Sequence, residues 1–242
     1  MKRAILKLAN SLLRPYQAQI VKIAPDPFTM TSAIERIRDH DISINTVIDI
    51  GASDGTWSVN AIPFYPSASF LAIEPLQERM AALEDRKREL ASFDYAMCVA
   101  GDSDAGIVTL NVSRDLDGST VDGSGGESRQ VPVRTIDSMV SERDLEGSFL
   151  LKFDTHGYEI PILAGARDTL KETNVIIMEV YNFKITEHAV RFHEMCFHME
   201  ELGFRCFDLA DPMLRLYDRS LWQMDLFFCR EDSAIFSHSQ YR

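Results

Sequence analysis

The stretch that most constrains this chain is a short apolar run followed by two closely spaced glycines. Residues 46–50 (TVIDI) precede Gly51 and Gly55. An apolar run of this length bounded by glycine predicts a strand buried on both faces, as in parallel sheets. Glycine just past such a strand lets the backbone approach a bound molecule closely. The sequence therefore predicts an open α/β sheet with a nucleotide-type site at the carboxyl end of this strand.

The carboxylates of the glycine loop distinguish between nucleotide ligands. A dinucleotide loop reads G-x-G-x-x-G and holds a pyrophosphate on backbone amides. Here Ser53 takes the place of the middle glycine, and Asp49 and Asp54 would repel a pyrophosphate. Two acids suit a cationic ligand, such as the sulfonium and ammonium of S-adenosylmethionine. We expect this cofactor, with Asp49 contacting it directly or through water, or capping the loop's own amides.

A second acid supports a nucleoside ligand. Glu74 closes the next predicted strand, residues 69–73, and lies nineteen residues beyond Gly55. An acid at this spacing is placed to accept both ribose hydroxyls, although it could instead favour the dipole of a following helix. Pro75 predicts that this helix begins immediately, with proline at its first position.

A third strand is predicted over residues 95–100, and its end should reach the adenine edge of the ligand. Asp102 could accept a hydrogen bond from the exocyclic amine, or Gly101 and Asp102 could form a plain turn. The residues expected to border the cofactor are Asp49, Gly51, Ala52, Ser53, Gly55, Trp57, Glu74, Pro75, Val99, Asp102 and Asp154.

Three segments resemble the FkbM family of S-adenosylmethionine-dependent methyltransferases: Val47–Gly55, Ala72–Pro75 and Leu150–Glu159. The resemblance spans residues 45–182, and the third segment is its most specific part. The family usually has an acid where this chain has His156. The resemblance implies a class I methyltransferase fold, a Rossmann-like, doubly wound, mostly parallel sheet with an antiparallel final strand. It also implies O-methylation of a sugar, glycan or hydroxylated natural product.

Asp154, His156 and Glu179 are the candidate catalytic residues. Asp154 closes a predicted strand at residues 149–153, and Glu179 lies near the end of the next, at residues 174–180. Because carboxyl ends of neighbouring parallel strands share one edge of the sheet, we expect the three side chains to converge near the donor methyl. His156 is the first candidate for the general base, since imidazole titrates near neutral pH.

Other roles stay open for the two acids. Asp154 could be the base, orient His156, bind the acceptor hydroxyl or cap the following helix. Asp154 and Glu179 could also hold a divalent cation that polarises vicinal hydroxyls, because carboxylates are its preferred ligands.

A polar, glycine-rich segment, residues 113–129, separates predicted strands at 107–112 and 130–133. Such a loop could close over the substrate or be a tolerated surface insertion, and we favour the closing loop. Ser119 and Thr120, with Tyr181 from the strand of Glu179, are the expected acceptor contacts.

Length, charge and cysteine content set the remaining expectations. We expect a methyltransferase domain over 41–232 with an insertion at 107–134, a helical extension at 1–40 and a tail at 233–242. A net charge of −12 excludes a nucleic-acid partner. The four cysteines show no C-x-x-C spacing, which indicates free thiols in a reducing, cytoplasmic location. The expected partner is a small-molecule or glycan acceptor, and a homo-oligomer is left open.

Residues 1–14 have the pattern of a basic amphipathic helix, with Lys2, Arg3, Lys7 and Arg14 beside an apolar face. Such a helix can lie on an anionic membrane surface. We expect this helix to dock instead on its own domain or on a second subunit.

Two other functional classes compete with the methyltransferase. A nicotinamide-dependent oxidoreductase is disfavoured by Ser53 and by the acid-rich loop. A non-catalytic cofactor-binding module of the same fold would bind the donor and methylate nothing.

Overall fold

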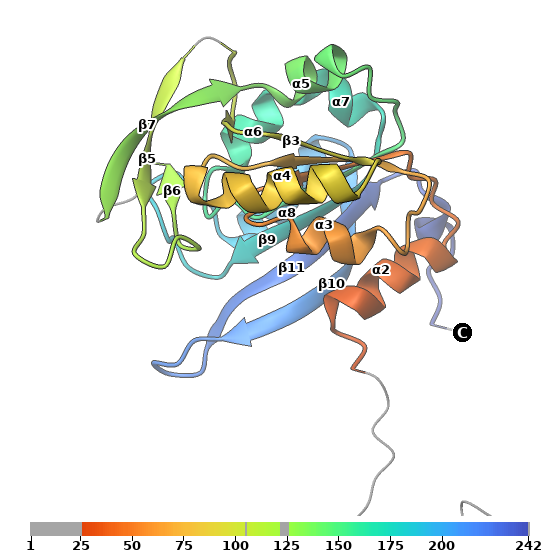
Figure 1. Cartoon of the computed structure of the whole chain (residues 1–242). Helices are drawn as coiled ribbons and strands as arrows, with labels where there is room; N and C mark the ends of the chain where they lie inside the picture. Colours follow the sequence, from red (N-terminus) through yellow and green to blue (C-terminus); the bar gives the residue numbers. More distant parts are fainter. Residues whose placement is uncertain (1–25, 105, 122–125, 242) are drawn as a thin grey trace, which may run out of the picture.

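A seven-stranded mixed sheet forms the centre of the molecule (Figure 1). The computed structural model describes residues 26–104, 106–121 and 126–241, so the predicted helix over residues 1–14 lies outside the described residues. The strand order is β10-β11-β9-β8-β1-β2-β3. The strands are β1 (Thr46–Ile50), β2 (Ser69–Ile73), β3 (Phe93–Ala96), β8 (Phe149–Phe153), β9 (Thr173–Tyr181), β10 (Phe204–Leu214) and β11 (Leu221–Arg230).

The five strands from β9 to β3 in this order are parallel, whereas β11 runs antiparallel to both of its neighbours. This arrangement confirms the expected class I methyltransferase fold. Because β1 pairs with β2 on one side and with β8 on the other, Gly51, Glu74 and Asp154 follow three adjacent strand ends. The sheet thus brings together residues that are a hundred positions apart in the sequence.

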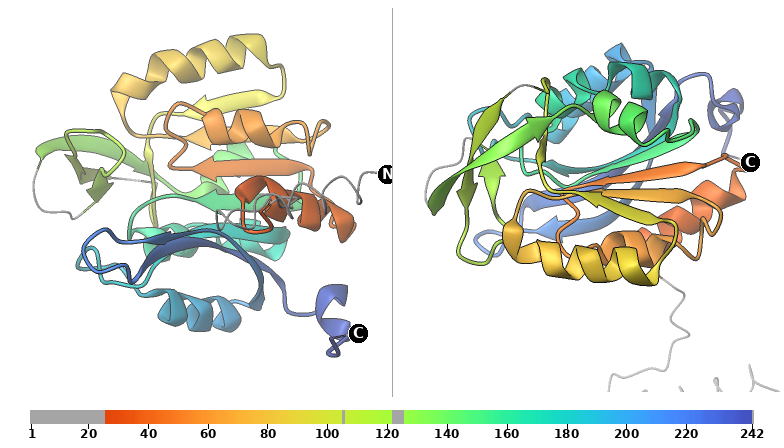
Figure 2. Two further views of the ribbon diagram at one scale, coloured as in Figure 1. Left: turned by 90° about the horizontal axis from the view of Figure 1, so that it is seen from below. Right: turned by 45° about the horizontal axis from the view of Figure 1, so that its top comes forward.

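Helices cover both faces of the main sheet in two layers (Figure 2). Alternate side chains of the strands pack against these two layers. Val47 of β1 joins one apolar core, and Ile48 joins the other on the opposite face. The Val47 layer comprises α2 (Met30–Asp39), α3 (Thr56–Ala61) and α4 (Met80–Glu89). The Ile48 layer comprises α5 (Ile136–Glu142), α6 (Glu159–Ala164), α7 (Arg167–Lys171) and α8 (Phe192–Glu201). With both faces covered, the central strands are mostly apolar. The charged exceptions in β1 and β8 are Asp49 and Lys152, whose charged groups lie 3.6 Å apart.

A second, four-stranded sheet is built from the region predicted as an insertion, residues 107–134, together with Val99 and Ala100 from the predicted third strand. Its order is β4-β7-β5-β6. The strands are β4 (Val99–Ala100), β5 (Ile107–Val112), β6 (Thr120–Val121) and β7 (Glu127–Arg134). β5 pairs antiparallel with both β6 and β7. Its apolar side chains form a small core of their own, which includes Leu110 and Val121.

The single strand expected over residues 95–100 is wrong. β3 ends at Ala96, and the chain then leaves the main sheet before Val99 and Ala100 pair with β7. The apolar run is continuous in the sequence although its halves belong to different sheets. Tyr95 and Ala96 are half-buried in the main sheet, and Val99 and Ala100 are buried in the second.

Pro75 does not begin a helix. Leu76 is extended, a 3₁₀ turn (η2) follows at Gln77–Arg79, and α4 begins at Met80. The reason is local: the Leu76 amide donates to the Glu74 carboxylate instead of entering a helix.

No helix of the described residues is long and apolar enough to span a bilayer. The C-terminal residues predicted as a tail include a 3₁₀ turn (η3) at Ala234–Ser237.

Substitution of Gly51 by alanine is expected to destabilise the protein by about 2–4 kcal/mol. Gly51 has a φ of +77°, and an added Cβ would lie 2.0 Å from the backbone oxygen of Asp154. Gly118→Ala is the matched control, because its new Cβ would meet nothing nearer than 3.5 Å. Urea unfolding followed by circular dichroism measures both, and equal stabilities for the two variants would contradict the expectation.

Candidate active site

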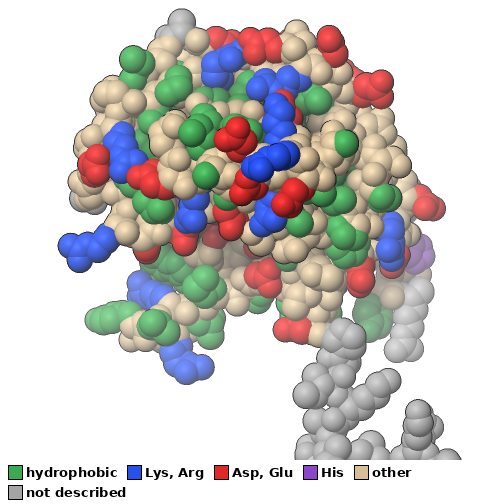
Figure 3. All heavy atoms as spheres, in the orientation of Figure 1, with side chains coloured by type: hydrophobic (Ala, Val, Ile, Leu, Met, Phe, Trp, Pro, Cys, Tyr) green, Lys and Arg blue, Asp and Glu red, His purple; other side chains and the backbone are tan. Residues whose placement is uncertain are grey.

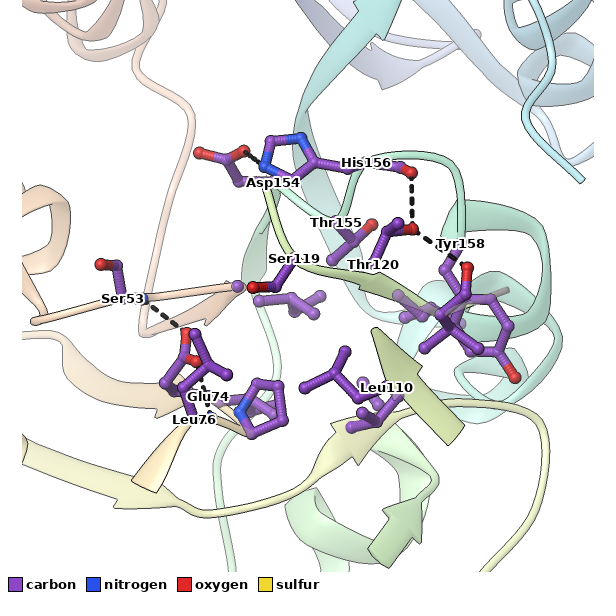
Figure 4. Close-up of a pocket in the computed structure, with 18 of the residues that line it drawn as sticks. Ser53, Glu74, Leu76, Leu110, Ser119, Thr120, Asp154, Thr155, His156 and Tyr158 are labelled. Atoms are coloured by element: carbon purple, nitrogen blue, oxygen red, sulfur yellow. Dashed lines mark hydrogen bonds and ion pairs between the residues drawn. The ribbon is translucent and has the colours of Figure 1, made fainter. Parts of the chain in front are cut away.

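A cavity of about 290 Å³ lies between the carboxyl edge of the main sheet and the second sheet (Figure 4). Ten of the residues predicted for the site line it, contributed by the loops after β1, β2 and β8, by β9, and by the second sheet with the residue before β6. They are Gly51, Ser53, Glu74, Pro75, Val99, Ser119, Thr120, Asp154, His156 and Glu179. The sheet therefore gathers most of the predicted site around one space.

Glu74 connects the glycine turn to the next strand end. One carboxylate oxygen accepts a hydrogen bond from the Ser53 amide at 2.8 Å, and the other accepts from the Leu76 amide at 2.8 Å. Burial raises the pKa of Glu74 to about 7, although both amides act to lower it. Each oxygen keeps a lone pair that can accept a hydroxyl hydrogen.

The floor of the cavity is apolar and comes from both sheets. Ile50 and Ile73 end two strands of the main sheet, Leu110 belongs to β5, and Ile162 comes from α6. An apolar slot beside a hydrogen-bonding acid suits a nucleoside, with a flat base and a polar ribose. Leu110 and Ile162 were not predicted, because no local pattern shows which strands and helices converge.

Asp49 does not line the cavity, which corrects its prediction as a direct cofactor contact. The side-chain alternation of β1 sends it to the face opposite Ile50, where it is fully buried. Its carboxylate accepts a hydrogen bond from the Ser58 hydroxyl at 2.8 Å. Asp49 therefore ties β1 to the first turns of α3.

Four more residues predicted for the cofactor lie outside the cavity lining. Ala52 donates its amide to the Ile73 carbonyl, and Gly55 is the left-handed residue before α3. Trp57, in the first turn of α3, lies with its ring 5.7 Å from the Lys152 ammonium. Asp102 is exposed, because Ala100 is the last residue of this segment that lines the cavity. The first three shape the turn, and Asp102 does not contribute to the cavity.

Asp154, His156 and Glu179 converge as predicted. Each offers one potential ligand atom, and these atoms lie within 4.8 Å of one another. His156 Nδ1 is 3.1 Å from the Glu179 carboxylate, and Nε2 is 3.9 Å from that of Asp154. His156 adopts a left-handed backbone with φ of +52°, which turns its ring into the site.

Both ring nitrogens of His156 act as hydrogen-bond donors. Nε2 is 2.6 Å from the Asp117 carbonyl oxygen, which can only accept. Nδ1 is 2.8 Å from the Tyr181 hydroxyl, whose own hydrogen is donated to Glu179 at 2.5 Å. Burial acts to lower the pKa of His156, but Glu179 and Asp154 outweigh it and raise this pKa to about 9. The imidazole is thus a cation at neutral pH.

Lys152 is a site residue that the sequence analysis missed. Its side chain is almost completely buried, with the ammonium 2.9 Å from Asp154 and 3.6 Å from Asp49. Burial raises the pKa of Asp154, yet the charges of Lys152 and His156 bring it below its usual value. A lysine inside the apolar run 149–153 was the available signal, because a buried charge needs a partner.

A groove of about 530 Å³ adjoins the cavity at His156 and Thr120, which line both spaces. Tyr181, predicted as an acceptor contact, lies here with Phe183 and Trp222. The rings of Phe183 and Trp222 stack with centroids 5.6 Å apart. The segment predicted as a closing loop contacts the same point, because the Thr120 hydroxyl donates to the His156 carbonyl at 3.1 Å.

The strand order, the glycine turn and the acid after β2 define a class I methyltransferase with a nucleoside-shaped cavity at its switch point. Residues 49–206 match the family described as the methyltransferase FkbM domain, so this chain belongs to that family. It is an S-adenosylmethionine-dependent methyltransferase. No curated protein matches it.

Solved structures resemble the chain at low sequence identity. One is an S-adenosylmethionine-dependent methyltransferase from Clostridium acetobutylicum, 10% identical, covering 95% of this chain and 98% of that one, with a TM-score of 0.49. Another is magnesium protoporphyrin IX methyltransferase from Synechocystis, 10% identical over 95% and 96% of the two chains, with a TM-score of 0.46. The assignment of the chain to its family rests on the family match alone.

Cofactor affinity is expected to rise as the pH increases from 6 to 8. A free Glu74 carboxyl with a pKa of about 7 loses its proton across this range, and the carboxylate is the form that accepts ribose hydroxyls. Glu74→Gln should weaken binding of S-adenosylhomocysteine by roughly tenfold or more and remove this pH dependence. Calorimetric titration measures both effects.

Glu78→Gln is the control, since Glu78 is ion-paired with Arg129 outside the cavity. Unchanged affinity and an unchanged pH profile in Glu74→Gln would remove Glu74 from the ribose site.

Proposed function

We propose that this methyltransferase is O-directed and acts on a hydroxyl of a sugar, a glycan or a hydroxylated metabolite. The observation that carries the proposal is the position of the Asp154 carboxylate, which lines the cofactor cavity beside His156, a residue that the cavity shares with the aromatic groove. An alcohol needs a group that takes up its proton as its oxygen attacks, and a carboxylate at this point is suited to that task.

The proposed chemistry asks little of the protein beyond alignment and proton removal. The bound cofactor supplies a methyl group activated by a cationic sulfur. Asp154 accepts a hydrogen bond from the acceptor hydroxyl and takes its proton as the oxygen bonds to the methyl carbon and the carbon–sulfur bond breaks. The Asp154 side chain is 37% exposed, so an acceptor can reach it.

His156, our first candidate for the base from the sequence, is better suited to a positioning role. A cation that donates from both nitrogens has no lone pair for a proton. Its charge instead lies between Asp154 and Glu179 and, with the charge of Lys152, holds the pKa of Asp154 below its usual value despite burial. Proton removal therefore passes to Asp154.

The residues of this cluster do not fit a divalent cation in the arrangement observed. Glu179 accepts hydrogen bonds from Tyr181 and Gln223, and Asp154 is paired with the Lys152 ammonium. A metal ion would have to displace these donors and the His156 cation.

The groove supports a hydroxylated acceptor of moderate size. Its aromatic side chains give flat apolar surfaces, and Thr120 and Thr186 add hydroxyls along its walls. Such a mixture suits a sugar ring, which has apolar faces and a polar rim. We further propose that the loop at 113–129 closes over the acceptor, that Ser119 and Thr120 contact it, and that the enzyme works in the cytoplasm.

Asp154→Asn is expected to lower kcat by about 10²- to 10⁴-fold while changing cofactor affinity only a few-fold. Asp168→Asn is the matched control, because that carboxylate is 78% exposed, pairs with Lys171 and lines neither the cavity nor the groove. The measurement is methyl transfer from labelled S-adenosylmethionine to a panel of hydroxylated acceptors. Near-normal turnover in Asp154→Asn would reject Asp154 as the base, and no turnover by the unaltered protein on any acceptor would favour a binding module.

The rate of methyl transfer is expected to fall as the pH rises through about 9. His156 holds its proton below this pKa, and its loss removes the cation that faces both carboxylates. A His156 acting as base would give the opposite profile, a rate that rises towards pH 9. The pH dependence of kcat in the unaltered enzyme and in His156→Gln distinguishes the two, because the glutamine variant should lose the high-pH limb.

A further inference from the structure

The charged side chains that line the aromatic groove are all basic. Among the described residues they are His156, Lys184 and Arg215, and no aspartate or glutamate of this part of the chain lines the groove. The whole chain, by contrast, has 37 acidic and 25 basic residues and a net charge of −12. A groove lined by one sign of charge raises the local concentration of ligands with the opposite sign. The groove therefore favours a ligand that carries an anionic group.

Arg215 is held in a fixed orientation at the tip of the hairpin that joins β10 and β11. In Figure 3 this hairpin projects at the lower left of the molecule, with basic side chains beside hydrophobic ones. Nε and Nη2 of Arg215 donate to the two carboxylate oxygens of Asp218, at 2.7 and 2.6 Å. Asp218 itself accepts from the amide and the hydroxyl of Ser220. The guanidinium carbon lies 4.1 Å from the centre of the Phe183 ring, so the side chain is fixed from two directions.

The basic end of the groove has hydrogen-bond donors that the described chain does not use. The pair with Asp218 leaves the Nη1 group of Arg215 without an acceptor among the described residues. Lys184 follows Phe183 in the sequence, is exposed and forms no ion pair with any described residue. A guanidinium edge and an ammonium both donate and cannot accept, and they bind carboxylates and phosphates well.

Aromatic rings connect this basic end of the groove to the catalytic turn. The Tyr181 hydroxyl lies 2.8 Å from Nδ1 of His156, and the Tyr181 ring meets the Trp222 ring edge-on with centroids 5.7 Å apart. Trp222 stacks on Phe183, and Phe183 contacts the guanidinium of Arg215. A hydroxylated ligand that lies along these rings can have a hydroxyl beside His156 and an anionic group at Arg215.

We propose that the acceptor of this enzyme is an anionic sugar or other hydroxylated molecule, whose carboxylate or phosphate binds Arg215 and Lys184. The proposal rests on the proposed methyl transfer to a hydroxyl in this groove, and it adds the group by which the acceptor is selected. The acids Asp154 and Glu179 line the cavity and not the groove. The His156 cation lies where the two spaces meet, and it reduces the repulsion between these acids and the anion of the acceptor.

Two simpler roles for the basic side chains explain less of the structure. A clamp within the hairpin accounts for the pairing of Arg215 with Asp218, but not for the unpaired ammonium of Lys184 in the same groove. A neutral sugar needs the aromatic rings and neither of the cations. An anionic group on the acceptor accounts for the rings, the fixed guanidinium and the ammonium together.

Kinetics with matched acceptors test the proposal. Glucose, galactose and mannose are each compared with the corresponding uronic acid and 6-phosphate, which separates a carboxylate from a phosphate. In at least one of these sets, kcat/KM for an anionic form is expected to exceed that for the neutral sugar by about tenfold or more. Arg215→Gln and Lys184→Gln should each remove most of this preference. Because Lys184 is exposed, its variant keeps the test valid if Arg215→Gln disturbs the hairpin.

Arg219→Gln is the matched control. Arg219 belongs to the same hairpin turn, and its replacement removes the same charge, but this residue does not line the groove. The preference for the anionic acceptor is expected to persist in this variant. An equal loss of preference in Arg219→Gln and Arg215→Gln would reflect the overall charge of the hairpin and would overturn the proposed site.

Calorimetric binding of the same acceptors, with S-adenosylhomocysteine present, separates failure of the anion site from failure of the proposed methyl transfer. If no acceptor is methylated, tighter binding of the anionic forms that is lost in Arg215→Gln would still support the anion site. Equal kcat/KM and equal affinity for neutral and anionic forms would overturn it. A preference that Arg215→Gln and Lys184→Gln both retain, or the absence of binding by every anionic form, would do the same.

Discussion

The buried ammonium of Lys152 is the interaction on which the site depends. It lies between Asp49, which anchors α3 to β1, and Asp154, which faces the reacting groups. Removing one partner of such a buried group leaves an uncompensated charge, at a cost of about 3–5 kcal/mol. One residue therefore links the turn that shapes the cofactor cavity to the carboxylate proposed to take the acceptor's proton. Lys152 therefore affects both the stability of this edge of the sheet and the ionisation state of Asp154.

Around that charge the site divides into an apolar half and an ionic half. The apolar half is made by strand ends of two sheets and contains one acid, Glu74, whose burial raises its pKa. The ionic half contains Asp154, His156 and Glu179, where opposite charges offset the cost of burial. The apolar half suits the nucleoside of the cofactor, and the ionic half suits a hydroxyl that must lose a proton. His156 lies where the two spaces meet.

The sequence predicted those parts of the fold that depend on local pattern. β1, β2 and β8 were found because each is an apolar run closed by glycine or an acid, and Asp154, His156 and Glu179 were brought together because parallel strands share one edge. Asp49 was misplaced because the strand period sends it to the opposite face of the sheet from the cavity. Leu110, Ile162 and the cationic state of His156 depend on contacts between distant segments, which a local pattern does not contain.

The bond between Thr120 and the carbonyl of His156, and that between His156 and the carbonyl of Asp117, both end on main-chain oxygen. Every residue type has a main-chain oxygen, so the side chains on either side of Thr120 can change without loss of these hydrogen bonds. Evolution can then vary the side chains that meet the acceptor while the segment stays fastened to the catalytic turn. Relatives with this attachment would diverge in acceptor preference sooner than in their chemistry.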